Sequence, residues 1–321
     1  MGEDVKISVI VATYNPGEWF GACVASVLNQ SEDRIELIVV DDGSECDIRE
    51  HLAQEQIADP RLRIERIGHS GVSGARNHGL SVARGEWIAF ADDDDMLHPD
   101  NLHRLLGMAE STGAEIAVGR MRYSELPDFR TIGRKRVALM TGRRAALHAL
   151  HQTAGFDNGV WAKLFRRDMF GPEVSFRPGR YEDLDIIYRL YERASKVVVT
   201  PEQVYFYRKR PGSFINTFSA ARADVLDVAD RIVRHYSGAD RVMKAAAADR
   251  AFGAACNILM ALSASGASMP ETERRCVDMI RRHRLSVAIN PRVRLKNKVG
   301  ALAALLSPRI FKFASRFVSA T

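Results

Sequence analysis

Four consecutive carboxylates, Asp92 to Asp95, follow an apolar stretch at residues 87–91. That stretch has the length and the aromatic and β-branched content of a buried strand, so the acids stand at its carboxyl end. Four like charges repel one another more strongly as water is excluded, and a divalent cation is the simplest compensation. Carboxylates favour hard cations such as Mg²⁺ or Mn²⁺. The alternative is an acidic turn that caps the next helix, since Pro99 suits a helix start.

Three strand–loop–helix units precede these acids, which implies parallel strands with right-handed crossovers. The strands are predicted at residues 6–13, 35–40 and 62–67, and the helices at 18–29, at 47–56 and after the glycine-rich loop 68–74. The carboxyl ends of parallel strands lie at one edge of the sheet, where open α/β sheets bind their ligands. We therefore expect the acids to converge with the polar residues that end the earlier strands, namely Thr13, Tyr14, Asn15, Asp41, Asp42, His69 and Ser70.

The rest of the chain is predicted to complete an α/β catalytic domain over residues 1–218, followed by a helical region over residues 219–321. The later elements of the first part are predicted as a helix at 99–111, a strand at 114–118, an irregular stretch at 121–136, a helix at 141–152, a helix that follows residues 181–185 and ends near 193, and two strands at 196–200 and 204–207. The helices of the second part are predicted at 220–236, 241–264 and 271–284, before a basic amphipathic tail.

Composition bounds the class of protein. An apolar content of 46% and a charged content of 27% are those of a soluble globular protein with a real core. The four cysteines form no CxxC pair, which argues against structural zinc and a disulfide framework and fits a reducing compartment. The acidic start resembles no signal peptide, and no apolar run approaches about 20 residues, so a cytoplasmic protein is expected.

Several nucleotide-binding and catalytic motifs are absent from the sequence. It contains no GxGxxG after the first strand, no GxxxxGK[ST] and no GxSxG. These absences argue against a dinucleotide-binding Rossmann domain, a P-loop protein and an α/β-hydrolase. A nucleotidyltransferase would need a glycine- and lysine-rich loop after the first strand, and residues 14–17 do not provide one. A bound nucleotide must therefore be held by something other than a glycine cradle.

Five segments in this order resemble the family 2 glycosyltransferases, in particular bacterial cell-surface polysaccharide and teichoic-acid-type enzymes. The segments are IVATYN at 10–15, VDDGS at 40–44, GARNHG at 74–79, FADDDD at 90–95 and ED at 182–183. The resemblance covers roughly residues 5–215 of the sequence. It implies a GT-A fold with a mostly parallel central sheet, a UDP-sugar donor and an inverting, metal-dependent transfer. A non-catalytic nucleotide-sugar-binding protein of the same fold is the alternative.

The resemblance also implies roles for individual residues. Asp94 matches the ligand of Mn²⁺ or Mg²⁺, Asp92 and Asp93 lie near the nucleotide and sugar, and Asp183 matches the general base. Arg76 matches a cation near the base and phosphates. The alternatives are helix capping for the acids and a solvated surface position for the arginine.

Recognition of the uracil base is expected at the first two strand ends. Asp41 or Asp42 should accept a hydrogen bond from the uracil N3–H, which cytosine lacks, while Thr13, Tyr14 and Asn15 line the nucleotide pocket. An ordinary Asp-Gly turn is the alternative for the aspartate pair.

The resemblance also implies a late basic or histidine loop that closes on the diphosphate, and Arg208, Arg210 and Ser213 are the candidates for it. Arginine suits this role because it binds phosphate in a bidentate manner. A surface basic turn is the alternative. The loop contains no histidine, so a histidine metal ligand is in doubt.

Acceptor contacts are predicted for Trp161, Lys163 and Glu182. A sugar ring stacks on aromatic side chains, although core packing explains Trp161 almost as well and Lys163 could simply be solvated. The acceptor is expected to be a cell-surface glycan or a polyol-phosphate polymer, by analogy alone.

Net charge is +6, with a pI near 9.2, and basic residues alternate with apolar ones over residues 291–321. Such a segment can lie on an anionic membrane surface, or it can pack on its own domain or on a second copy of the chain. The basic residues form no aromatic-interleaved stripe, so nucleic acid is not an expected partner. These patterns predict a cytoplasmic protein, peripheral at the inner face of the cell membrane if the tail binds lipid.

Overall fold

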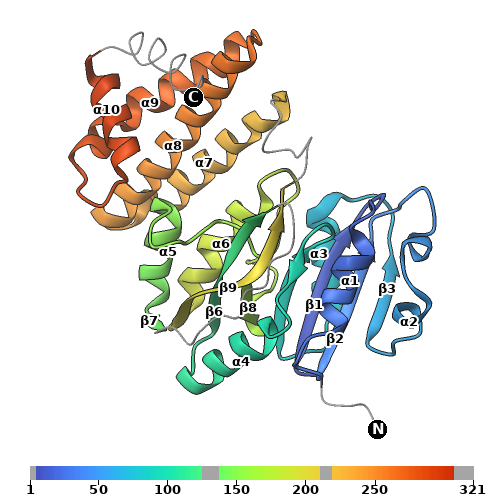
Figure 1. Cartoon of the computed structure of the whole chain (residues 1–321). Coiled ribbons are helices and arrows are strands. Elements are labelled where there is room, and N and C mark those ends of the chain that lie inside the picture. Colours follow the sequence, from blue (N-terminus) through green and yellow to red (C-terminus); the bar gives the residue numbers. More distant parts are fainter. Residues whose placement is uncertain (1–4, 125–136, 210–218, 307–321) are drawn as a thin grey trace. The chain divides into compact units, whose positions relative to one another are not determined.

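The computed structural model describes residues 5–124, 137–209 and 219–306 (Figure 1). The described residues fall into two compact units, one of 5–146 with 158–209 and one of 147–157 with 219–306. The boundary predicted between residues 218 and 219 stays a prediction about domains. The elements of the first unit are β1 (Ile7–Thr13), α1 (Phe20–Leu28), β2 (Ile35–Asp41), η1 (Ile48–His51), α2 (Gln54–Ile57), β3 (Leu62–Arg66), α3 (Gly71–Val82), β4 (Trp87–Asp92), β5 (Met96–Leu97), α4 (Asn101–Thr112), β6 (Ile116–Ser124), β7 (Ala138–Met140), β8 (Lys163–Arg166), η2 (Arg167–Met169), α6 (Glu182–Arg193) and β9 (Val197–Arg208).

The central sheet has two halves. Strands β3, β2, β1 and β4 lie side by side and all pair in parallel, as the repeated strand–helix pattern predicted (Figure 1). Beyond β4 the order continues through β8, β6, β9 and β5, where only the β6–β9 pair is parallel. Strand β7 pairs with β9 in the antiparallel sense.

The two faces of the parallel strands carry different side chains because successive residues of a strand alternate in direction. Val9 and Val11 of β1 pack with α1 and α4 in one apolar core. Ile10 faces the other way, toward α3, where a Cβ added to Gly79 would lie 2.5 Å from Ile10 Cγ2. The glycine of the GARNHG segment therefore allows α3 to approach the sheet closely.

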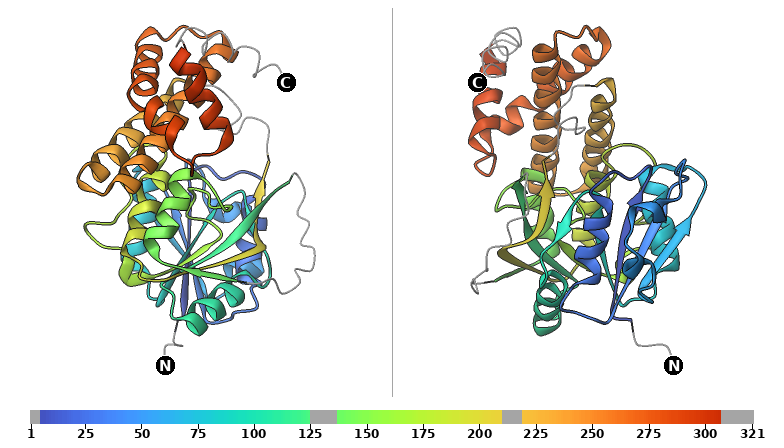
Figure 2. Two further views of the ribbon diagram at one scale, coloured as in Figure 1. Left: turned by 90° about the vertical axis from the view of Figure 1, so that its left-hand side faces the viewer. Right: turned by 45° about the vertical axis from the view of Figure 1, so that its right-hand side comes forward.

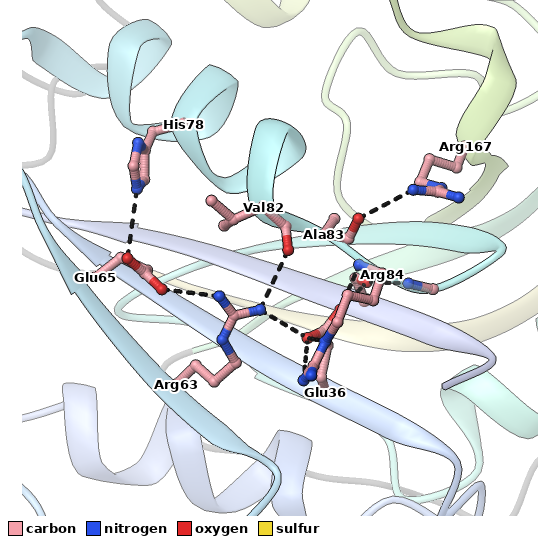
Figure 3. A network of polar contacts seen from close by, with 10 residues as sticks. Glu36, Arg63, Glu65, His78, Val82, Ala83, Arg84 and Arg167 are labelled. Carbon is pink, nitrogen blue, oxygen red and sulfur yellow. Dashed lines mark hydrogen bonds and ion pairs between the residues drawn. The ribbon is translucent and has the colours of Figure 1, made fainter. Parts of the chain in front are cut away.

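The C-terminal end of α3 is fixed to β2 and β3 by a network of ion pairs around Glu36 (Figure 3). The Glu36 carboxylate accepts hydrogen bonds from Ser8 Oγ at 2.6 Å, from Arg84 and from Arg63. Burial alone would raise the pKa of Glu36, but these hydrogen bonds outweigh burial and lower it. Arg63 also donates to the Val82 carbonyl, so the network holds α3, which carries Arg76, in place.

Three secondary-structure predictions were wrong. The stretch predicted to be irregular from residue 121 begins inside β6, which runs to Ser124. The helix predicted at residues 47–56 is two short helices, η1 and α2. The two strands predicted on either side of Pro201 are one continuous strand, β9. Its ladder with β6 shifts register between Val118 and Met121, opposite Pro201, so the missing N–H of the proline is tolerated there.

The second unit is helical, as predicted, and its helices α7, α8, α9 and α10 are visible in Figure 2. Helix α8 contacts α7 and α9, and α9 contacts α10. Helix α8 is the one described helix long and apolar enough to cross a membrane, and 72% of its most apolar window is buried, as in the core helix of a globular domain. The elements near or in this unit are α5 (Gly142–His151), η3 (Ala220–Asp224), α7 (Val225–His235), η4 (Tyr236–Gly238), α8 (Arg241–Ser265), α9 (Pro270–Ile289) and α10 (Leu295–Leu306).

Candidate donor and catalytic site

The parallel sheet brings the first, second and fourth strand ends together. Thr13 lies opposite Asp41 in the β1–β2 register, and Ala12 lies opposite Asp92 in the β1–β4 register. Thr13 Oγ1 donates a 2.6 Å hydrogen bond to Asp93 Oδ2, which joins residues 80 positions apart in the sequence. The predicted convergence of these strand ends is therefore confirmed.

The two aspartates proposed for uracil recognition are buried and already accept hydrogen bonds. Asp41 Oδ1 accepts from the Ser44 N–H at 2.8 Å, and Asp41 Oδ2 lies 3.3 Å from Arg66 Nη1. Asp42 accepts from the Ser70 and Gly71 N–H groups at 2.7 and 2.8 Å, at the start of α3. A carboxylate has about four acceptor positions, so a further bond from uracil would use the remaining ones. The role in base recognition stays a prediction.

A pair of aromatic rings stands beside these aspartates. Tyr14, which is 46% exposed, lies with its ring centroid 4.4 Å from that of His69. His69 Nδ1 is 3.1 Å from Asp42 Oδ2, so the imidazole is held at the end of β3. Asn15, at φ 48°, accepts from the Glu45 N–H and thereby ties the β1 turn to the β2 turn. Sequence reasoning placed His69 at this edge but gave it no role in nucleotide binding.

Arg76 joins three elements of the site. Its guanidinium donates to Glu182 Oε1 at 2.6 Å and to Asp92 Oδ1 at 2.8 Å, and the side chain is 5% exposed. The guanidinium also lies 5.5 Å from the centre of the Phe176 ring. Arg76 therefore connects α3 to the end of β4 and to the start of α6, and in this geometry it positions two acids.

Asp183 lies one residue beyond that bridge, in the first turn of α6. Arg76 holds the preceding residue, Glu182, by the hydrogen bond already described. Tyr181, one residue earlier, adopts a left-handed conformation at φ 58°, which is costly for a bulky side chain. Burial and the charge of Glu182 raise the pKa of Asp183 to about 7, although the charge of Arg76 opposes the rise. A carboxylate with such a pKa suits proton transfer near neutral pH.

The remaining acids of the turn have separate environments. Asp95 is buried and accepts from Tyr205 Oη at 2.8 Å and from the Arg208 N–H at 2.9 Å. Burial, and then the charges of Asp92 and Asp94, raise the pKa of Asp95 to about 9. Asp94 is partly buried, and its carbonyl oxygen accepts from Arg208 Nε at 3.0 Å.

Arg208 is a buried side chain at the end of β9, so the alternative of a surface basic turn is wrong for this residue. Its guanidinium lies 4.0 Å from the centre of the Trp19 ring and holds the backbone of Asp94. Arg208 therefore fixes the acidic turn through its hydrogen bonds to the Asp94 carbonyl and, by its backbone N–H, to the Asp95 carboxylate. Arg210 and Ser213 lie outside the described residues. Sequence reasoning missed Trp19 and Tyr205, since an aromatic residue in a turn or strand gives no signal of such a role.

A cation at the acidic turn would need ligands from the donor diphosphate in addition to those of the protein. Among the described residues, no group of three or more His, Cys, Asp or Glu side chains is placed to hold a metal ion by itself. Mg²⁺ is commonly bound by one or two carboxylates together with substrate phosphates and water. After burial, the charges of Asp92 and Asp94 are the next causes that raise the pKa of Asp95, so the carboxylates of this turn repel one another. Asp94 would supply the protein ligand, and its assignment stays a prediction.

Three aromatic rings form a row beside the site. The Trp161 ring centroid is 5.7 Å from that of Tyr207, which is 5.0 Å from that of Tyr123. Trp161 Nε1 donates to Met121 Sδ at 3.2 Å, and Tyr123 is 51% exposed. The sequence analysis named Trp161 as the aromatic contact for the acceptor, and the structure adds the rings of Tyr207 and Tyr123 beside it.

Lys163 is a correction to the sequence analysis. The side chain is 1% exposed, and its ammonium donates to the carbonyl of Trp161 at 3.3 Å. It belongs to β8, which lies between β4 and β6 in the sheet, so the alternative of a solvated lysine is wrong, while the role in acceptor binding stays a prediction. The basic residue type suggested contact with an anion or with water, whereas the side chain of Lys163 is buried at the start of β8.

We expect Arg76→Gln to lower the free energy of unfolding by about 3 kcal/mol, because it leaves two largely buried carboxylates without their cation. Urea unfolding near neutral pH measures the change. Arg49→Gln is the matched control, since its ion pair with Asp47 is about half exposed on both sides and should contribute little. Equal effects of the two substitutions would show that the Arg76 bridge does not stabilise the fold.

The parallel strand ends, the acidic turn and a carboxylate at the start of α6 are the features expected of a GT-A glycosyltransferase from the resemblance of the sequence to family 2. The chain matches the family model described as glycosyl transferase family 2 over residues 8–171. Glycosyltransferase GlyG of Streptococcus pneumoniae is 30% identical over 66% of this chain and 73% of GlyG. The uncharacterized glycosyltransferase EpsJ of Bacillus subtilis is 31% identical over 64% of this chain and 62% of EpsJ. The chain therefore belongs to glycosyl transferase family 2 and is a glycosyltransferase.

Solved structures confirm the predicted GT-A fold. S. aureus TarS 1-349 in complex with UDP-GlcNAc matches 98% of this chain and 89% of its own with a TM-score of 0.66 at 18% identity. The mannosyltransferase PcManGT of Pyrobaculum calidifontis, in complex with GDP-Man and Mn²⁺, matches 98% of this chain and 86% of its own with a TM-score of 0.54 at 16% identity.

Proposed function

We propose that this glycosyltransferase transfers a sugar from UDP to an acceptor hydroxyl with inversion at the anomeric carbon, and that Asp183 is the general base. The observation that carries the proposal is the Arg76 bridge. It holds Asp92 of the acidic turn and Glu182 together, and thereby keeps Asp183 beside the turn where the diphosphate would bind. The pKa of Asp183, raised to about 7, suits a base that works near neutral pH.

The bonds change as follows. The acceptor oxygen attacks the anomeric carbon from the face opposite the diphosphate, and the bond from that carbon to the diphosphate oxygen breaks with its electron pair leaving on UDP. The acceptor proton passes to the Asp183 carboxylate. Asp94 and Mn²⁺ or Mg²⁺ would neutralise charge on the departing diphosphate. Arg208 keeps the Asp94 backbone in position throughout.

The donor is proposed to be a UDP-sugar bound along the ends of β1 and β2. Tyr14 and His69 supply an aromatic surface for the base, and Asp41 and Asp42 lie within the adjoining turns. A fold match with TarS bound to UDP-GlcNAc supports this donor class, while the match with PcManGT bound to GDP-Man makes GDP the competing nucleotide.

The acceptor is proposed to be a cell-surface glycan or polyol-phosphate polymer. The relative ExoO of Rhizobium meliloti, 29% identical over 72% of this chain and 69% of its own, is named a succinoglycan biosynthesis protein. The row formed by Tyr123, Tyr207 and Trp161 offers aromatic faces on which the C–H groups of a sugar ring can pack. Transfer would take place in the cytoplasm, at the inner face of the cell membrane.

We expect UDP with Mn²⁺ to stabilise the protein against heat more than either compound alone, because cation and diphosphate complete one site. A ligand at a hundred times its Kd stabilises the folded state by about 2.7 kcal/mol. Thermal unfolding with UDP, GDP, CDP and dTDP, each with and without Mn²⁺, measures the effect. Stabilisation by GDP but not by UDP would refute the assignment of the donor.

A further inference from the structure

Within residues 219–306, the second unit carries large apolar side chains that the described helices do not cover. Of eleven large apolar side chains exposed in the described parts of the chain, six lie on α9 and α10. Leu295 is 76% exposed, Ile289 64% and Leu285 61%. We name this set the α9–α10 surface, and its residues are Leu285, Ile289, Leu295, Val299, Leu302 and Leu305.

Helix α10 packs through one face and presents leucines on the other. Asn297, Ala301 and Ala304 are buried, and their spacing places them on the packed face. Leu295, Val299 and Leu302 follow the i, i+4, i+7 spacing of the opposite face. A helix of a water-exposed surface normally has the reverse arrangement, with polar residues outward.

Positive charge surrounds this surface. Residues 279–321 contain ten lysines and arginines and no acidic residue, so the rest of the chain is net negative although the whole carries +6. Of these basic residues, four in the described part of the chain are exposed, namely Arg281, Arg282, Arg292 and Lys296, and Lys298 is partly exposed. Lys296 and Lys298 flank the row of leucines on α10. An apolar stripe between basic residues is the pattern of a helix that lies in a membrane interface.

We propose that the α9–α10 surface binds the anionic surface of a lipid bilayer, with the leucines inserted among the lipids and the basic residues at the headgroups. Charge complementarity selects this partner. A two-fold dimer through the same face would bring two basic segments together without compensating acids. Nucleic acid would leave the leucine face exposed to water. The sequence predicted lipid contact for residues 291–321, whereas the structure adds Leu285 and Ile289 of α9.

The test uses the full chain and sedimentation with two kinds of vesicle, phosphatidylcholine alone and an equimolar mixture with phosphatidylglycerol. We expect binding to the anionic vesicles only, and loss of binding at about 1 M salt, where the Debye length falls to about 3 Å. Each basic residue near an anionic surface contributes about fivefold, so Lys296→Gln with Lys298→Gln should weaken binding about 25-fold. Lys244→Gln on α8 is the matched control for lost charge.

The apolar contribution is tested with Leu295→Asp and Leu302→Asp combined, which should weaken binding about 100-fold or more. Leu139→Asp, at a residue 52% exposed in the first unit, is the matched control and should bind normally. The melting temperature and UDP affinity of the double variant should stay unchanged, because the two leucines face solvent. Because UDP affinity is measured separately from vesicle binding, failure of the membrane proposal can be distinguished from failure of the donor assignment.

Four results would overturn the proposal. They are equal binding to neutral vesicles, a dimer in the wild type that Leu295→Asp dissociates, binding to a DNA duplex that the leucine substitutions do not weaken, and a large loss of melting temperature in the leucine variant. The last result would mean that the chain itself covers this surface.

Discussion

Asp183→Asn should lower kcat by about 10²- to 10⁴-fold, since that is the usual contribution of a general base. Affinity for the UDP-sugar should change little, because the donor contacts proposed above lie at the ends of β1, β2 and β3 and do not include Asp183. The asparagine keeps the size of the side chain, and its amide oxygen can still accept from the Leu184 N–H, as Asp183 Oδ1 does at 2.7 Å. Turnover and donor affinity measured on one preparation test the expectation.

The stability of the same variant has a definite sign. The pKa of Asp183 in the folded protein is about 7, above the ordinary value of 3.8, so the folded state prefers the neutral carboxyl. The resulting destabilisation is absent below the ordinary pKa and is complete above pH 7. Asp183→Asn should therefore melt at the same or a higher temperature than the wild type above pH 7. In the wild type, kcat/KM should fall as pH drops through about 7.

Asp185→Asn is the matched control, two residues along the same helix. Asp185 is buried and lies 3.3 Å from Arg177 and 3.6 Å from Arg189. Its substitution should lower the melting temperature while turnover per folded molecule is retained. The reverse outcome, in which Asp183→Asn turns over like the wild type, would remove Asp183 from the role of base.

Asp94→Asn should weaken Mn²⁺-dependent UDP binding by about a hundredfold or more, since loss of even an indirect partner of a metal ligand costs 10- to 100-fold. Binding of Mn²⁺ without UDP should be weak in the wild type too, because the described residues place no cluster of three ligands. Isothermal titration of UDP with and without Mn²⁺ measures both effects. The fold should persist, since the Asp94 carbonyl that accepts from Arg208 is unchanged.

Asp100→Asn controls for the loss of one carboxylate nearby. Asp100 lies before α4, where its side chain is 42% exposed and 3.4 Å from Arg104. UDP affinity in the presence of Mn²⁺ should be that of the wild type. If Asp94→Asn binds UDP and Mn²⁺ as well as Asp100→Asn does, Asp94 is not the metal ligand.

The early part of the fold could be predicted because local pattern and connectivity agree there. Strands β1, β2 and β4 are mostly apolar runs that end at polar residues, and parallel connection brings Thr13, Asp41 and Asp92 to one edge. The later strands are paired across long sequence distances, and the antiparallel neighbours of β8 leave no local pattern. The position of Pro201 inside β9 depends on a register shift in another strand, which no local rule contains.

The sequence by itself determined the acidic turn, the order of the family segments and the Glu182-Asp183 pair, because each consists of consecutive residues. Tertiary structure decided what those residues contact. Neither Arg76 nor Arg208 has an acidic residue within five positions in the sequence, yet in the fold Arg76 bridges Asp92 to Glu182, and Arg208 packs on Trp19 and donates to the Asp94 carbonyl. Lys163 is buried for the same kind of reason, since strand order and not residue type sets which side chains reach solvent. Burial and charge pairing act between segments far apart in the chain, so only the folded arrangement fixes the charge state of Asp183 and Asp95.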